Sequence, residues 1–316
     1  MSLASDLHPS QKKVDKIKGE EEKKEEVVGK TKYLKEKSHS SVFQSSSSPN
    51  PQVGLNSIMK KSQTRVRKTL EGKPEFVMSF VDTQNVLKKL AKYKTNFVVL
   101  HVDLVGSTKL AMRLTLDRLT MIIQAFNQEM SVIVKAFGGY ILKYVGDAVL
   151  AFFVLPGHKS EAKVVCMNAV NCAKYMLRIA REVINPIFNQ YHCPEMNLRI
   201  GIDVGENAII QSGWDTHPNI RNKRKNNKNN ININNNKKKH LLVKKPVYDV
   251  LSYTISIAVK MTALAHPNHL VIGDPMYNLL DGKQRSAFQR LNMTPDIWNY
   301  VCRNSEGNIY SLYTDI

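Results

Sequence analysis

Two aspartates lie at glycine-containing turns, each next to a short apolar segment. Asp103 lies in the stretch His-Val-Asp-Leu-Val-Gly-Ser-Thr, and Asp147 follows a glycine and precedes Ala-Val-Leu-Ala-Phe-Phe. A carboxylate in a buried strand is costly unless a positive charge compensates it, and a divalent cation compensates it most strongly. Because only oxygen ligands are in view, the pair predicts a site for Mg²⁺ or Mn²⁺, ions that one or two carboxylates usually hold together with substrate phosphates.

The turn after Asp103 fits such a substrate. Gly106-Ser107-Thr108 closes the first apolar segment and opens an amphipathic helix. The first N–H groups of a helix have no partner within the helix, and the helix dipole favours an anion at this end. We therefore expect this turn to bind a triphosphate.

The elements that must position these residues follow from hydrophobic periodicity and turn residues. We expect strands at 97–105, 140–144, 148–154, 196–204, 247–251 and 269–272, and helices at 108–137, 159–189 (perturbed at Pro186), 254–265 and 275–280. The β-α-β-β-α-β order predicts an α+β fold of the split βαβ, ferredoxin-like type, a central antiparallel sheet with helices packed on it. In that fold the first strand and the hairpin are neighbours, so Asp103 and Asp147 would converge.

These motifs resemble the catalytic domain of class III nucleotidyl cyclases. The family carries its metal-binding aspartates in D-(I/L)-x-G-(F/S)-T and G-G-x-x-x-K-x-x-G-D, and residues 138–147 read Gly-Gly-Tyr-Ile-Leu-Lys-Tyr-Val-Gly-Asp. Residues 198–205 resemble the family's R-x-G-I-H-x-G strand, with Asp203 in place of the histidine. The similarity runs from about residue 96 to 280, with one insert, and resembles in particular the first of the two cyclase domains of soluble adenylyl cyclases.

The resemblance implies an adenylate cyclase, a phosphorus–oxygen lyase that converts ATP to cyclic AMP and pyrophosphate. Asp103, Asp147 and the carbonyl of Leu104 would hold two Mg²⁺ (or Mn²⁺) ions, and the 106–108 turn would bind the triphosphate. One ion would activate the ribose 3′-hydroxyl and the other would draw charge from the leaving pyrophosphate.

One stretch departs from the family pattern D-x-x-G-x-x-V-N-x-x-x-R. Asp249 is kept, but Ser256 stands for the asparagine and Lys260 for the arginine that act on the transition state. Serine is too short to orient the ribose, and lysine lacks the planar fork of arginine. The resemblance therefore implies the metal-bearing half of an asymmetric pair, whose partner cyclase domain supplies Asn and Arg. Lys143 occupies a position that in the family often reads the adenine or lines the partner site.

In such a pair Lys143, Asp249, Ser256 and Lys260 would face a second cleft. Soluble adenylyl cyclases use the corresponding cleft for bicarbonate, so we hypothesise that Lys143 and Lys260 hold a small regulatory anion. The structural alternatives are a turn-capping role for each aspartate, an edge lysine at 143 and a solvated helix lysine at 260. The functional alternatives are a guanylyl cyclase domain and a non-catalytic domain that binds a nucleotide or a partner.

Composition divides the 316-residue chain. Residues 1–84, rich in Lys, Glu and Ser at their start, are predicted to be disordered, and residues 85–316 to form the cyclase domain with a low-complexity Asn/Lys insert at 221–245. Residues 1–70 carry a net +7 and residues 215–245 a net +9 of the formal +19. The remaining core is nearly neutral and has no basic stripe interleaved with aromatics, so we expect no nucleic-acid partner.

The rest of the composition indicates a cytoplasmic protein. The four cysteines form no C-x-x-C pair, which favours reduced thiols. The longest apolar run, 148–156, is far shorter than the ~20 residues that span a bilayer, and the charged N-terminus lacks a signal-peptide apolar region. We expect no transmembrane segment.

Overall fold

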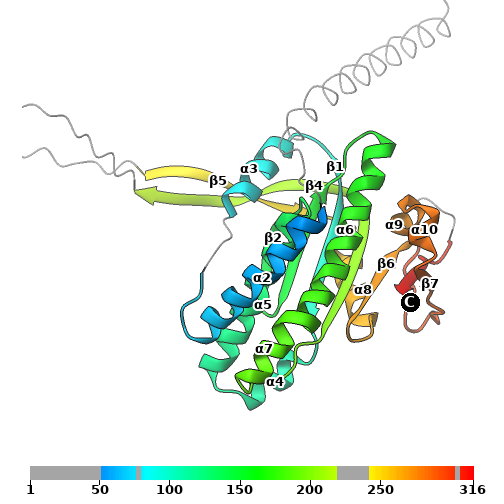
Figure 1. Ribbon diagram of the computed structural model, residues 1–316. Helices are drawn as coiled ribbons and strands as arrows, with labels where there is room; N and C mark the ends of the chain where they lie inside the picture. Colours follow the sequence, from blue (N-terminus) through cyan, green and yellow to red (C-terminus); the bar gives the residue numbers. More distant parts are fainter. Residues whose placement is uncertain (1–50, 76–79, 219–241, 303–306) are drawn as a thin grey trace, which may run out of the picture.

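The computed structural model describes residues 51–75, 80–218, 242–302 and 307–316 (Figure 1). An eight-stranded sheet forms its centre, in the order β2-β3-β1-β4-β6-β8-β7, with β5 paired to β4. The strands are β1 (Thr95–Leu104), β2 (Tyr140–Val145), β3 (Ala148–Val154), β4 (Leu198–Pro218), β5 (Leu242–Leu251), β6 (His269–Gly273), β7 (Phe288–Arg290) and β8 (Leu312–Asp315). The order β2-β3-β1-β4, with helices before β2 and after β3, is the expected split βαβ arrangement, so the predicted α+β fold is confirmed.

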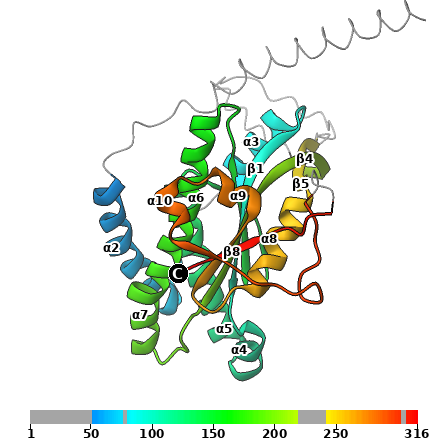
Figure 2. The same cartoon turned by 90° about the vertical axis from the view of Figure 1, so that its right-hand side faces the viewer.

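Helices cover both faces of the sheet (Figures 1 and 2). They are α2 (Pro51–Leu70), α3 (Phe80–Leu90), α4 (Ser107–Arg113), α5 (Leu116–Ala136), α6 (Lys159–Ile179), the π-turn η1 (Ala180–Ile184), α7 (Asn185–Gln190), α8 (Tyr253–Leu264), α9 (Asp274–Leu279) and α10 (Gly282–Arg285). Val98, Leu100 and Val102 of β1 pack into the core with α5 and α6, whereas Phe97 and Val99 pack with α3 and α8. Strand β1 is apolar on both faces because both faces are covered.

The two long predicted helices are interrupted. The first is broken at Leu114, which is extended, and α5 begins after Thr115, whose hydroxyl accepts from the Arg118 N–H. The second contains η1 directly before Pro186, which lies in the first turn of α7. Proline has no N–H to donate to the α-helical hydrogen-bond ladder, and the widened π-turn lies next to it. This is where the sequence predicted a perturbed helix.

Strands β4 and β5 are much longer than predicted. Their antiparallel pairing runs from Ala208 opposite Leu251 to Pro218 opposite Leu242. The two strands form an arm that extends beyond the sheet (Figure 1). Residues 242–245, expected inside the insert, are the start of β5, so the predicted insert boundary is wrong there. The rest of the insert, 219–241, lies outside the described residues.

Helix α2 corrects a second prediction, because it lies within the stretch expected to be disordered. Arg65 forms a bidentate ion pair with Glu129 of α5, with Nε–Oε1 at 2.8 Å and Nη2–Oε2 at 2.6 Å, and Val66 is fully buried. A few buried contacts therefore dock a helix that is poor in apolar residues. Residues 1–50 lie outside the described part, and the domain boundary at residue 85 stays a prediction.

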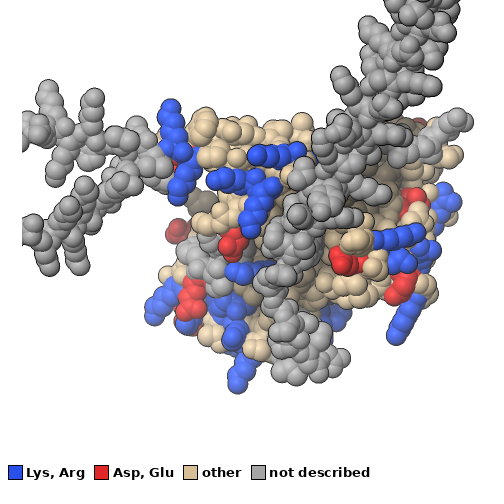
Figure 3. Space-filling view, turned by 90° about the horizontal axis from the view of Figure 1, so that it is seen from above, with Lys and Arg blue, Asp and Glu red and all other residues tan. Residues whose placement is uncertain are grey.

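The surface charge is uneven. Basic side chains cover more of the face seen in Figure 3 than acidic ones, which lie among them. Lys244 and Lys245 on the arm are exposed. Within the part of the chain that the structure describes, none of the helices combines the length and the apolar character that a membrane crossing needs.

Candidate active site

Strand pairing brings Asp103 and Asp147 together. Asp103 of β1 lies opposite Ala148 of β3, the residue that follows Asp147. The pairing therefore places both carboxylates at the end of the hairpin where β2 turns into β3. Burial raises the pKa of the Asp103 carboxyl above its ordinary value, and the adjacent Asp147 carboxylate raises it further.

Arg199 opposes this shift. It lies opposite Asp103 in the β1–β4 ladder, and its Nη2 donates to Asp103 Oδ2 at 2.8 Å. Arg199 Nε is buried and has no hydrogen-bond partner among the described residues. Reasoning from the sequence did not select Arg199 as a site residue, although it opens the Arg-Ile-Gly-Ile-Asp segment that was compared with a family strand.

The 106–108 turn lies beside the aspartates. Gly106 has φ of 73°, a left-handed conformation that favours glycine, and it begins α4 without any side-chain hydrogen bond to the first-turn N–H groups. None of the side chains of α4 is buried. Leu104 ends β1 and is buried, so its carbonyl is carried by the same rigid strand as Asp103.

A cavity of about 480 Å³ adjoins this turn. Ser107, Thr108 and Asp147 line one side of it, and Leu119 and Ile123 of α5 line the other. Three residues that the sequence selected therefore share one concave surface. The 106–108 turn and the hairpin turn border a space whose α5 wall combines the apolar Leu119 and Ile123 with the polar Thr120 and Gln124.

The residues of the second expected cleft form two separate pairs. Lys143 Nζ on β2 donates to Asp249 Oδ2 on β5 at 2.6 Å. Ser256 and Lys260 are exposed one helical turn apart on α8, and the Lys260 ammonium lies 5.3 Å from the centroid of the Tyr300 ring. The charge of Lys143 is thus already balanced by a carboxylate, and Lys260 rests on an aromatic face.

Comparison with known proteins agrees with the geometry. The family described as the adenylate and guanylate cyclase catalytic domain matches residues 90–217. Residues 90–217 therefore belong to a class III nucleotidyl cyclase domain. The cyclase domain is 35% identical over 112 residues to a cytidylate cyclase of Staphylococcus aureus, covering 35% of this chain and 26% of that protein. It is 28% identical over 122 residues to a cytidylate cyclase of Escherichia coli, covering 38% and 26%.

The chain therefore spans about a quarter of the length of these relatives. Among solved structures, the adenylyl cyclase CyaB of P. aeruginosa aligns with a TM-score of 0.49 and 17% identity, covering 71% of this chain and 95% of that chain. The guanylyl cyclase Cya2 aligns with a TM-score of 0.48 and 13% identity, covering 71% and 92%.

Two further titratable groups of the cyclase domain face the same side of the sheet as Asp103. Burial lowers the pKa of His101 to about 4, and its Nδ1 lies 3.0 Å from Thr262 Oγ1, so it packs as a neutral ring. Asp203 accepts a hydrogen bond of 2.6 Å from the Tyr310 hydroxyl, and burial raises its pKa to about 7. Asp203 stands where the family motif has histidine, and here it joins β4 to the C-terminal segment.

Proposed function

We propose that this cyclase domain converts a nucleoside triphosphate, ATP first, to its 3′,5′-cyclic monophosphate and pyrophosphate. The observation that carries the proposal is the β1–β3 pairing, which joins Asp103 and Asp147 next to Arg199 and the 106–108 turn. Two carboxylates beside free helix N–H groups fit a metal-bound triphosphate. The proposal rests on this arrangement together with the family match.

The residues fit two Mg²⁺ or Mn²⁺ ions. The described residues hold no group of three or more His, Cys, Asp or Glu side chains that could bind a metal, so Asp103 and Asp147 would need the Leu104 carbonyl, water and phosphate oxygens to complete the coordination. Mg²⁺ is usually bound in this way. When bound, such ions lower the pKa of an attacking hydroxyl and stabilise the leaving oxygen of an in-line displacement.

The chain's own residues would then position the triphosphate. Arg199 neutralises Asp103 in the structure, and a cation at Asp103 would release its guanidinium for a phosphate oxygen. Its unpartnered Nε provides a second donor for the same anion. The backbone N–H groups of Ser107 and Thr108 would bind a further phosphate oxygen.

The choice of base rests on the resemblance and the relatives. In an asymmetric pair Lys143 and Asp249 would face the second cleft, not the one that holds this domain's metal ions, so they do not select the nucleotide bound at Asp103 and Asp147. ATP remains the proposed substrate through the resemblance to soluble adenylyl cyclases. CTP is the second candidate, supported by the relatives named cytidylate cyclases. A guanylyl cyclase domain stays the further alternative.

A second cyclase domain completes the proposal. Ser256 and Lys260 cannot replace an Asn/Arg pair at the transition state, so a partner domain would supply both. Regulation by bicarbonate would depend chiefly on Lys260, because Asp249 balances Lys143. A non-catalytic role would apply if no partner restores turnover.

The test is a product assay with ATP, CTP, GTP and UTP and either Mg²⁺ or Mn²⁺. The chain is assayed alone and mixed with a cyclase domain that bears Asn and Arg but lacks the metal aspartates, with and without bicarbonate at fixed pH. We expect turnover of ATP or CTP only in the mixture, and its loss in Asp147→Asn. Absence of any cyclic product with all four nucleotides, or equal turnover in Asp147→Asn, would overturn the proposal.

A further inference from the structure

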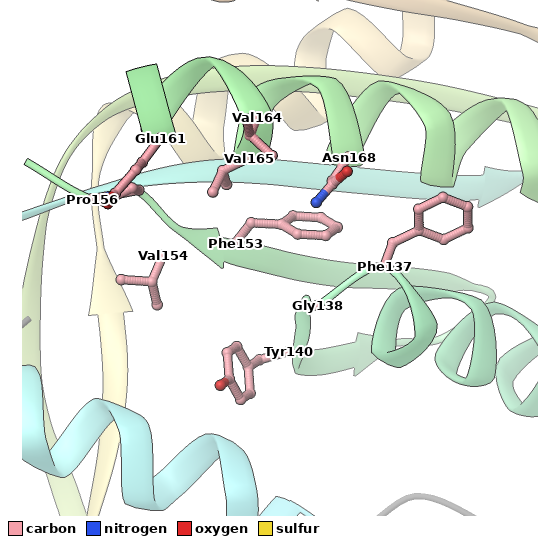
Figure 4. A pocket seen from close by; sticks show the side chains of 10 residues that line it. All are labelled: Phe137, Gly138, Tyr140, Phe153, Val154, Pro156, Glu161, Val164, Val165 and Asn168. Carbon is pink, nitrogen blue, oxygen red and sulfur yellow. The ribbon is translucent and has the colours of Figure 1, made fainter. Parts of the chain in front are cut away.

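A second cavity lies at the open end of the β2–β3 hairpin (Figure 4). It has a volume of about 440 Å³ and is lined by residues of β2, β3, α6 and the turn that follows α5. Tyr140 pairs with Phe152 at this end, while Val145 pairs with Ala148 beside Asp147. At a rise of about 3.3 Å per residue, the two ends of β2 are roughly 17 Å apart. The cavity is therefore separate from the candidate active site.

The floor of this cavity is aromatic and rigid. Phe153 is 1% exposed, and its ring lies against the backbone of Gly139, where an added Cβ would be 2.8 Å from the ring. A side chain at 139 would therefore displace the ring that forms the floor. Phe137 brings a second ring to the wall, and Val164, which is 50% exposed, lies at the rim (Figure 4). Tyr140 also lines the cavity, but its ring stacks on Phe152, which points to the opposite face of the sheet from Phe153.

The polar groups of the cavity are few. Figure 4 shows the Asn168 carboxamide beside the Phe153 ring and Glu161 near Pro156. Glu161 is the one charged residue in the lining, and the neighbouring Lys159 and Lys163 are not part of it. Glu161 lies in the first turn of α6, where the helix dipole favours a negative charge. On the α6 side the cavity thus combines the Phe137 and Phe153 rings with one carboxylate and one amide, and these two polar groups lie about two helical turns apart on α6.

We infer that this cavity binds a small aromatic amine, with its ring against Phe137 and Phe153 and its protonated nitrogen near Glu161. Cavities of ~300–1,000 Å³ with apolar walls and a few placed polar groups are typical of small-molecule sites. Aromatic walls also attract a cationic group through the ring quadrupole. The inference does not depend on the proposed cyclase reaction, because it concerns binding alone.

The test uses three named probes, phenethylamine, tryptamine and 2-naphthylmethylamine, and the neutral alcohol that matches each. Binding to the full chain is measured by saturation-transfer NMR and by isothermal titration. Val164→Trp fills the mouth from an exposed position, and Glu161→Gln removes the charge at nearly constant shape. Glu195→Gln, an exposed carboxylate outside the cavity lining, is the matched control. Thermal unfolding of each variant establishes that it is folded.

We expect saturable binding of at least one amine to the wild-type chain and to Glu195→Gln. An exposed ion pair contributes up to ~1 kcal/mol, so Glu161→Gln and the neutral alcohol should each bind about five-fold more weakly. Val164→Trp should abolish binding. The inference is overturned if no amine binds saturably, or if binding is the same in Glu161→Gln and Val164→Trp as in the wild type. Should Val164→Trp fail to fold, the comparison of Glu161→Gln with Glu195→Gln decides alone.

Discussion

Replacing Asp203 by asparagine should stabilise the domain at alkaline pH. Asp203 is fully buried, and Tyr310 donates a 2.6 Å hydrogen bond to its Oδ1, while Oδ2 has no partner among the described residues. Burial raises its pKa from 3.8 to about 7. An amide keeps an oxygen for the Tyr310 hydroxyl and carries no charge.

The sign of the effect follows from linkage. A carboxyl with a raised pKa in the folded state binds its proton more tightly there than in the unfolded chain, so folding is favoured at acid pH and loses stability as pH rises from about 4 through 7. Each pKa unit corresponds to about 1.4 kcal/mol. Between pH 5 and pH 8 the unfolding free energy of Asp203→Asn relative to wild type should therefore grow by about 2 to 3 kcal/mol.

The measurement is urea unfolding of both proteins at pH 5 and pH 8, followed by circular dichroism. Glu195→Gln removes an exposed carboxylate. Its unfolding free energy relative to wild type should therefore be the same at pH 5 and at pH 8. Two results would contradict this prediction: Asp203→Asn is less stable than wild type at pH 8, or its gain in unfolding free energy is the same at both pH values. Either result would mean that burial of the Asp203 carboxylate does not destabilise the fold at alkaline pH.

Three further predictions concern the site, α2 and the insert. Asp147→Asn should remove metal-dependent turnover of the paired enzyme while the melting temperature stays within a few degrees of wild type, and near-normal turnover would exclude a metal-ligand role. Arg65→Ala leaves Glu129, whose side chain is 1% exposed, without its ion-pair partner. Urea unfolding should therefore show a loss of about 3 to 5 kcal/mol in unfolding free energy. A loss below 1 kcal/mol would mean that α2 detaches at little cost. A variant in which a short Gly/Ser loop replaces residues 219–241 should keep the melting temperature and the turnover of wild type, since closure entropy depends only weakly on loop length. A large drop in either quantity would assign the insert a structural role.

The sequence alone determined the β-α-β-β-α-β order and the selection of Asp103 and Asp147. Short apolar runs bounded by glycine turns are local signals, and a carboxylate inside such a run stands out without knowledge of the fold. The hairpin at 140–154 was predicted nearly to the residue for the same reason. The perturbation at Pro186 also follows from one residue's lack of an N–H.

Only the tertiary structure decided which side chains meet across distant strands. Arg199 becomes part of the site through the β1–β4 register, and Lys143 meets Asp249 through the placement of β5. Helix α2 was missed because its stability depends on a buried ion pair with a helix 64 positions away, not on its own composition. The raised pKa of Asp203 likewise arises from burial by β6 and the C-terminal segment, because desolvation is set by what packs against a group rather than by its neighbours in the chain.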